Sequence, residues 1–197
     1  KISADDIKYA KEFGYVIKLL GVAKNTEDGI EVKVHPMLIP NNHPLANVND
    51  AFNAVFVHGK AMDDAMFMGR GAGQMPTASA VVGDIIDVCR NIVHDSCGRI
   101  GCCCYKNLEV KDITDTKSKF FLRLEVADKQ GVLANIASVL GNSGVSIAQV
   151  VQKSGKDGVA ELVIITAEVL EKNFNDAMAV FKGLSAVKNI AGVIRVY

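Results

Sequence analysis

Hydrophobic and polar positions in the first part of the chain predict a short helix followed by strands. Ser3 stands before two aspartates in an N-cap pattern, which predicts a helix ending near Glu12. Apolar runs on either side of turn residues then predict two hairpins, the first turning at Asp28-Gly29. We expect at least four mostly antiparallel strands: Tyr15–Lys24, Ile30–Val34, Ala51–Val57 and Met66–Met68. Between the hairpins, three prolines predict a loop: Pro36, Pro40 and Pro44.

Apolar residues then recur at helical spacing. They predict a helix over about Ala78–Val93, with Asp84 and Asp87 on its polar side. Because one side is so apolar, we expect this side to pack against the preceding strands. Two adjacent rows make it up: Val81, Ile85, Val88 and Ile92, and Val82, Ile86, Cys89 and Val93.

The last part of the chain has a clearer pattern. Residues 107–119 are charged and lack core periodicity, so the domain boundary is expected near Lys106–Lys117. Beyond it the period predicts strand, helix, strand, strand, helix and strand, with a polar turn at Ser154–Gly158. These elements are Phe120–Val126, Val132–Leu140, Val145–Gln152, Val159–Thr166, Glu171–Phe181 and Ile190–Val196.

The order β-α-β-β-α-β is the ferredoxin-like arrangement. The predicted fold class is therefore α+β. A mostly antiparallel sheet with helices is expected in residues 1–106, a linker in 107–118, and a ferredoxin-like domain in 119–197.

Composition excludes several classes of partner. Lys+Arg and Asp+Glu both number 22, and this balance argues against nucleic acid and anionic membrane surfaces. No run approaches the roughly 18 apolar residues of a membrane span. Nothing in the first ten residues resembles a signal peptide.

The cysteines indicate a reducing cytoplasm. Five are present, four of them within Cys97–Cys104, and an odd, clustered set is a poor disulfide framework. A zinc site would need two separated ligand pairs, but His94, Cys97 and Cys102 have no second pair. We therefore expect free thiols and no metal.

A glycine-rich stretch, Gly69–Thr77, leads into the predicted helix. Backbone N–H groups and the helix dipole at such a turn can bind phosphate. A dinucleotide fingerprint would need a parallel strand before it and a βαβ unit around it, whereas the preceding strand belongs to a hairpin. From the pattern alone, a ligand-contacting loop and a tight turn for close backbone packing stay equally open.

The motif itself resembles that of homoserine dehydrogenases. The residues are Gly69-Arg70-Gly71-Ala72-Gly73, followed by Pro76-Thr77-Ala78-Ser79-Ala80-Val81 and Asp84. Upstream stretches resemble the family in order and spacing: Val34–Pro40, His43–Ala46 and Asn53–Val55. The resemblance covers about residues 1–93.

This resemblance implies an oxidoreductase of threonine, methionine and isoleucine biosynthesis, which interconverts L-homoserine and L-aspartate 4-semialdehyde. It implies that Gly71, Ala72 and Gly73 approach the nicotinamide end of NADP or NAD. The catalytic lysine and the main nucleotide-binding domain are expected upstream of Lys1. The fragment alone is therefore expected to be inactive.

No catalytic residue is assigned in this chain. The histidines His35, His43 and His58 are expected to be structural or surface residues. Asp84 is expected to be a solvated or capping carboxylate.

Leu124–Ala134 resembles the opening of an ACT domain, which implies regulation by a small amino acid, with threonine the expected effector. Gly131 allows a sharp turn, after which N–H groups of Val132, Leu133 and Ala134 can bind a carboxylate. Asp128 could cap this helix or receive an ammonium group. Many family members have proline where Gln130 stands, so the turn is less rigid here.

Two alternatives remain at this stage. The domain could serve only for dimerisation, or the chain could be a non-catalytic amino-acid-binding module. In either case a homo-oligomer, dimer or tetramer, is expected, because a sheet with an open face needs covering.

Overall fold

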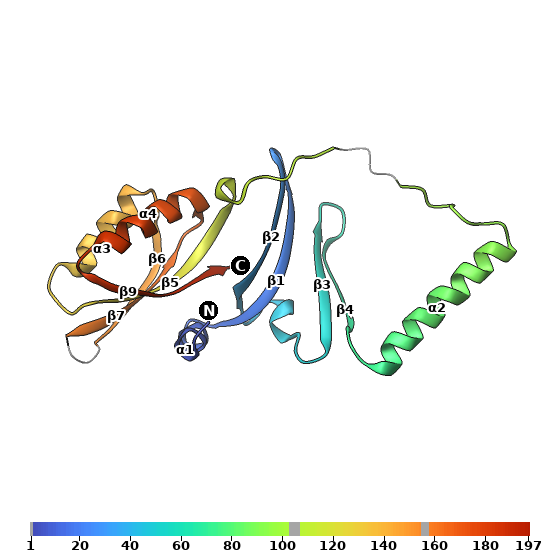
Figure 1. Cartoon of the computed structure of the whole chain (residues 1–197), viewed down its shortest axis with the longest axis horizontal. Coiled ribbons are helices and arrows are strands. Elements are labelled where there is room, and N and C mark those ends of the chain that lie inside the picture. The colour runs from blue at the N-terminus through green and yellow to red at the C-terminus, as the bar shows by residue number, and fades with distance from the viewer. Residues whose placement is uncertain (1, 103–106, 155–157) are drawn as a thin grey trace. The chain divides into compact units, whose positions relative to one another are not determined.

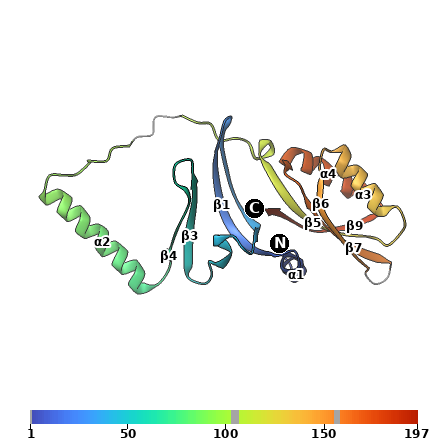
Figure 2. The same ribbon diagram turned by 180° about the vertical axis from the view of Figure 1, so that it is seen from behind.

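The computed structural model describes residues 2–102, 107–154 and 158–197. They form two compact units, one of Lys1–Asn41 with Leu108–Tyr197 and the other of Asn42–Asn107 (Figures 1 and 2). This division differs from the segments expected from the sequence, because the first hairpin belongs to the same sheet as the C-terminal strands. Part of the expected boundary near Lys106 and of the expected turn at Ser154–Gly158 lies outside the described residues.

The C-terminal strands and helices have the predicted βαββαβ order. Strand β9 lies beside β5, β5 beside β7, and β7 beside β6, with antiparallel pairing throughout. The short strand β8 also pairs with β5. The bounds are β5 Lys117–Ala127, α3 Val132–Asn142, β6 Ile147–Ser154, β7 Val159–Thr166, β8 Val169–Leu170, α4 Glu171–Gly183 and β9 Val187–Val196.

The first hairpin extends this sheet. Helix α1 (Ala4–Glu12) precedes β1 (Tyr15–Thr26) and β2 (Gly29–Pro40), which pair along their whole length. The end of β2 also pairs in parallel with β9, at Met37 and Leu38, so the sheet order is β1-β2-β9-β5-β7-β6.

The predicted proline loop is wrong over Pro36–Pro40, which form the end of β2. These prolines flank Met37 and Leu38, which pair with β9, and the whole of β2 also pairs with β1, so ladder pairing on both sides of this segment keeps it extended.

Two hydrophobic cores lie on opposite faces of the C-terminal sheet. Helices α3 and α4 cover one face, where alternate β5 residues such as Phe120 and Leu122 pack against Phe174 and Phe181. The other core contains Tyr9 and Ala10 of α1, packed with Leu38, Phe121, Val163, Ile165, Ile194 and Val196. Because side chains alternate along a strand, consecutive residues of β5 serve different cores.

The predicted linker over residues 107–118 contains ordered contacts. The Ile30 N–H donates to the Glu109 carbonyl over 2.9 Å, and the Lys111 N–H donates to the Ile30 carbonyl over 2.9 Å. A Cβ at Gly29 would lie 2.7 Å from the Glu109 carbonyl oxygen, so the hairpin turn needs glycine here. A short 3₁₀ helix, Ile113–Asp115, follows, and the last two linker positions already belong to β5.

The second unit contains a short 3₁₀ helix (Pro44–Asn47), strands β3 (Phe52–Gly59) and β4 (Asp63–Arg70), and helix α2 (Gln74–Val93). Strands β3 and β4 form the predicted second hairpin. The expectation that α2 packs against the strands is wrong, because no residue of α2 is buried.

The apolar rows of α2 are open to solvent. Ile85 is 56% exposed, Val88 54% and Val93 78%. In Figures 1 and 2, α2 leaves the end of β4 with no strand of its unit alongside it. Among the described residues, no helix combines the length and hydropathy that crossing a membrane requires.

Candidate functional site

The glycine loop connects strand β4 to helix α2. The Gly71 N–H donates to the Ala51 carbonyl over 2.9 Å, which ties the loop to the start of β3. Gly73 is the N-cap of α2 and has a φ of 130°, and no side chain caps the helix. Pro76 lies in the first turn, where its missing N–H has no intrahelical acceptor to lose. The loop therefore presents backbone rather than side chains at a helix N-terminus.

Gly71 and Gly73 are needed for different reasons. A Cβ at Gly71 would lie 1.8 Å from Nδ2 of Asn53, so the Asn53 side chain occupies the space that any side chain at position 71 would take. At Gly73 the positive φ itself strains any other residue, although the nearest atom to a Cβ, Cδ of Pro76, would be 3.2 Å away. Asn53 was not recognised from the sequence as part of this site, although it belongs to one of the motifs that carry the resemblance.

The loop also fits a flat ligand. Gly71, Ala72 and Gly73 are all exposed, and the largest side chain among them is a methyl group. The backbone of this loop is therefore open to close approach by a flat ligand.

The histidines take the structural and surface positions that were expected. His43 accepts a hydrogen bond from the Leu45 N–H at 3.2 Å and packs on the Phe56 ring. His58 lies at the far end of β3, with an exposed contact to Asp64 of 2.7 Å. His35 is half-buried, and burial, together with nearby Arg195, holds the pKa of its imidazole below the ordinary value.

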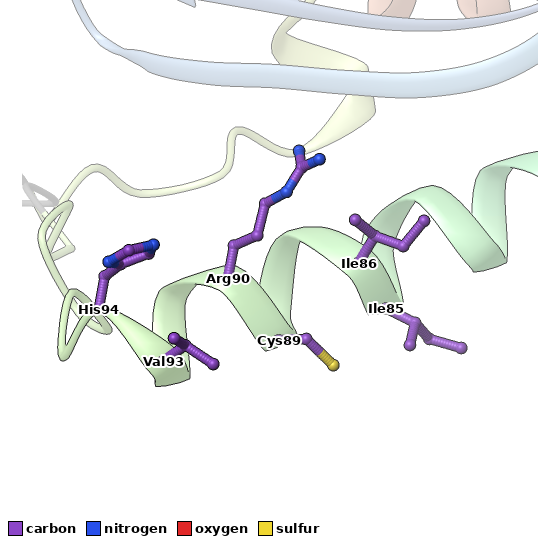
Figure 3. A pocket seen from close by; sticks show the side chains of 6 residues that line it. All are labelled: Ile85, Ile86, Cys89, Arg90, Val93 and His94. Carbon is purple, nitrogen blue, oxygen red and sulfur yellow. The ribbon is translucent and has the colours of Figure 1, made fainter.

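A hollow of about 270 Å³ lies on α2, and none of its lining residues belongs to either predicted site. It is lined only by side chains of α2 and its C-cap, which Figure 3 shows at close range: Ile85, Ile86, Cys89, Arg90, Val93 and His94. Among the described residues, no side chain from a second element lines the hollow, so it belongs to the uncovered surface of α2 and is not an enclosed ligand site.

The predicted effector turn connects β5 to α3. Asp128 N–H donates to the Gly158 carbonyl over 2.9 Å, which holds the turn against the start of β7. Gly131 is the N-cap of α3, with φ 83° and ψ −10°, a left-handed conformation that favours glycine. The N–H groups of Leu133 and Ala134 are first-turn donors that have no intrahelical acceptor.

Asp128 does not cap α3, since no side chain caps this helix. It is exposed, as is Gly131, whereas Val132 is buried and anchors the helix in the core. The turn thus combines an exposed carboxylate with helix N-terminal donors, which are the two chemical groups that a zwitterionic amino acid would need.

Sequence reasoning missed a buried ionic cluster under α1. Arg123 of β5 donates to Asp6 over 2.8 Å, to Glu161 over 2.8 Å and to Ser3 over 2.9 Å. Burial alone would raise the pKa of Asp6, but hydrogen bonds from Ser3 and Arg123 outweigh it and hold that pKa below its ordinary value. The available signals were the Ser3–Asp6 capping box, and an arginine within an apolar strand.

A second buried polar cluster joins β2 to the C-terminal elements. Lys33 donates to Ser118 Oγ over 3.0 Å, and Ser118 donates to Glu171 over 2.8 Å. Arg195 binds both oxygens of Glu171, each at 2.6 Å. Glu171 is the first residue of α4, where the helix dipole also favours a carboxylate. Burial opposes ionisation of Glu171, yet these hydrogen bonds keep its pKa below the ordinary value.

Cys89 and Cys97 are exposed free thiols. Within the described ranges, no group of three or more His, Cys, Asp or Glu side chains is placed to hold a metal ion. Two members of the cysteine cluster, Cys103 and Cys104, lie outside those ranges.

Comparison with known proteins gives two family matches. The family model described as homoserine dehydrogenase matches residues 1–86, and one described as ACT domain matches residues 114–195. The homoserine dehydrogenase of Pseudomonas aeruginosa is 38% identical, over 100% of this chain and 47% of its own length. That of Neisseria gonorrhoeae is 40% identical, over 99% of this chain and 46% of its own length.

Solved structures agree with these matches. The crystal structure of a homoserine dehydrogenase from Thiobacillus denitrificans has a TM-score of 0.90 and 38% identity, covering 100% of this chain and 46% of that one. The crystal structure of a homoserine dehydrogenase from S. aureus has a TM-score of 0.61 and 28% identity, covering 98% of this chain and 44% of that one. The chain spans about half the length of these relatives. It belongs to the homoserine dehydrogenase family and carries an ACT domain.

Proposed function

We propose that the chain is the C-terminal part of a homoserine dehydrogenase, which interconverts L-homoserine and L-aspartate 4-semialdehyde with NAD or NADP. Its ACT domain binds a small amino acid, threonine first among the candidates, and feedback from that ligand regulates the enzyme. The parent enzyme works in the cytoplasm as a homo-oligomer, a dimer or tetramer. Residues 1–197 have no dehydrogenase activity by themselves.

The observation that carries this proposal is the exposed Gly71–Gly73 loop at the start of a helix whose apolar side has no partner among the described residues. A helix with one strongly apolar side is stable only when that side is covered. The relatives are about twice as long as this chain, so the rest of a longer polypeptide can supply the cover.

Within that enzyme, the residues of the loop have a limited role. The nicotinamide ring, when bound, exchanges a hydride with the substrate. Gly71, Ala72 and Gly73 let the ring approach the backbone, and the first-turn N–H groups of α2 favour negative charge nearby. Asp84 is given no role as a general base, because it lies on the exposed surface of α2 and shares its helix with the apolar rows.

Regulation rests on the effector turn. The Leu133 and Ala134 N–H groups can bind the carboxylate of an amino acid, and the Asp128 carboxylate can bind its ammonium group.

The edges of the sheet support the proposal of a homo-oligomer. Strands β1 and β6 are its two outer strands, and they expose backbone groups that could pair with a second copy of the chain.

Nicotinamide absorbance with L-homoserine tests the catalytic part of the proposal. The full-length protein and residues 1–197 are assayed in parallel with NAD and with NADP. We expect turnover only from the full-length protein. A full-length protein that turns over with neither cofactor would overturn the function, and turnover by residues 1–197 would overturn the need for the upstream half.

Titration calorimetry with threonine, serine, methionine and lysine tests the effector. Residues 1–197 are used rather than the ACT segment alone, because β2 and α1 complete its sheet and core. We expect saturable heat with one of the four, weakened by Asp128→Asn and abolished by Gly131→Val, whose side chain the left-handed turn cannot accommodate. If none of the four binds to the chain or to the full-length oligomer, the ACT domain is an assembly element.

A further inference from the structure

Helix α1 lies on the face of the C-terminal sheet that is opposite α3 and α4. It buries Tyr9 and Ala10 against residues of β5, β7 and β9, among them Phe121 and Val163. The helix belongs to the stretch that matches the homoserine dehydrogenase family, whereas the three strands belong to the stretch that matches the ACT domain. The contact therefore joins the dehydrogenase segment to the regulatory segment.

A buried ionic cluster fixes this helix in place, and we define it as Ser3, Asp6, Arg123 and Glu161. The Arg123 side chain is 6% exposed and that of Asp6 is fully buried. One carboxylate oxygen of Asp6 accepts from Arg123 Nε, while the other accepts from the Ser3 N–H at 2.8 Å and its hydroxyl at 2.9 Å. The guanidinium thus binds the helix N-terminus and strand β7 at the same time.

The fit around Asp6 is close. A Cβ at Gly192 of β9 would lie 2.5 Å from its carboxylate oxygen, so the carboxylate lies directly against the strand backbone. Next to it, the Tyr9 hydroxyl donates to Glu161 over 2.5 Å. The cluster joins α1 to all three strands, β5, β7 and β9.

Two of these strands run into the proposed effector turn. Arg123 lies in β5, whose last residue, Ala127, directly precedes Asp128. Glu161 lies near the start of β7, and the Asp128 N–H is bonded to Gly158 just before that strand. A ligand at the turn would therefore act on the ends of both strands that hold Arg123 and Glu161.

We propose that the Ser3–Asp6–Arg123–Glu161 cluster transmits effector binding from the ACT domain to the dehydrogenase segment by moving α1 together with β5 and β7. The inference rests on the proposed regulation by an amino acid. Its physical basis is that a buried carboxylate cannot be left without its arginine, so α1 follows any shift of β5 rather than sliding over it. Strand β1 begins three residues after α1 ends, so the movement passes directly into the first hairpin.

The test uses the full-length enzyme and the variant Arg123→Met, which keeps an unbranched side chain of similar bulk and removes the three hydrogen bonds of the guanidinium. Lys153→Met is the matched control, because Lys153 also joins the sheet to α1, through Glu12 at 2.6 Å, but both side chains are 42% exposed. Three quantities are measured: the rate without effector, effector affinity by calorimetry, and the effector concentration that gives half of the rate change.

We expect Arg123→Met to bind the effector and to keep its rate without effector within about twofold. It should lose the rate change or need at least tenfold more effector to show it. Lys153→Met should behave like the wild type. If Arg123→Met is poorly folded, Asp6→Asn retains the shape and removes the charge. Asp6→Asn should then shift the response in the same direction by a smaller factor.

The outcomes distinguish the transmission role of the cluster from the proposed regulation by an amino acid. A wild-type enzyme that responds to the effector, with Arg123→Met and Asp6→Asn responding equally well, overturns the transmission role and leaves regulation intact. A wild-type enzyme whose rate never changes with any of the four amino acids overturns the proposed regulation, and with it this inference.

Discussion

Replacing Gly71 by alanine tests whether the glycine loop is shaped for the cofactor or only for packing. The backbone at Gly71 is outside the left-handed region, so alanine brings no backbone strain there. The effect of the added methyl group therefore comes from one neighbour. It would lie 1.8 Å from Nδ2 and 2.6 Å from Cγ of Asn53.

The size of the effect follows from this overlap. Nonbonded atoms of this kind are at optimal separation near 3.5 Å, so either the Asn53 side chain or the loop must move by more than an ångström. Asn53 is exposed, so its side chain can move aside, and an off-rotamer side chain costs about 0.5–1.5 kcal/mol. If this strain falls on the loop that receives the cofactor, it corresponds to a loss of about 2- to 12-fold in kcat/KM.

A double-mutant cycle in the full-length enzyme measures the coupling between the methyl group added at position 71 and the Asn53 side chain. Gly71→Ala, Asn53→Ala and the double variant are compared by kcat, by KM for the nicotinamide cofactor and by unfolding midpoint. We expect Gly71→Ala to raise the cofactor KM, and Asn53→Ala to make room for the methyl group and restore most of the loss in the double variant.

Two results would refute the reasoning. If the double variant is no better than Gly71→Ala, Asn53 does not govern the loop. If the unfolding midpoint falls while the folded enzyme keeps normal kinetic constants, the glycine serves packing alone and the cofactor assignment is wrong.

Three further predictions concern stability and assembly of residues 1–197. Phe174→Ala should lower the free energy of unfolding in urea by about 3–5 kcal/mol, because Phe174 is only 2% exposed. Val180→Ala is the control and should have a much smaller effect, since Val180 is 47% exposed. Equal losses of stability in the two variants would contradict the assignment of Phe174 to the core. The pKa values of Asp6 and Glu161 are lowered by folding, so their contribution to stability is complete above their ordinary values of 3.8 and 4.5 and is lost as pH falls through the folded values. The difference in melting temperature between the wild type and Asp6→Asn should therefore be smaller at pH 3 than at pH 7. An equal difference at both pH values would argue against a stabilising role of the ionised Asp6 carboxylate. Ile85→Glu should reduce self-association seen by light scattering, because it charges the uncovered side of α2; an unchanged mass would show that this side is not the contact.

The ACT segment was predictable from the sequence because its patterns are local. Alternation placed the strand after Lys119, and glycine turns separated the helices from the strands. Strand β7 and the start of α4 match the predicted limits. The N-cap at Ser3 was predictable for the same reason, since a capping box is contained within four residues.

The sequence predictions that proved wrong, for α2 and for the end of β2, all depend on contacts between residues that are distant in the chain. Helix α2 has the pattern of a packed helix, and the pattern is real, but the described residues contain no surface that covers it. The end of β2 appeared to be a loop because prolines usually interrupt strands, yet pairing with β1 along its length keeps it extended.

The sequence by itself determined the local elements, the glycine turns and the family resemblance, because each depends on residues that are close together in the chain. Only the tertiary structure decided that β2 joins β9, that Asn53 occupies the space beside Gly71, and that Arg123 is buried against Asp6. Asp6 and Arg123 are 117 positions apart, and nothing in the alternation of either segment specifies that the two charges meet. Pairing of this kind is set by the free energy of the whole fold, in which burying one charge is tolerable only when its partner is buried with it.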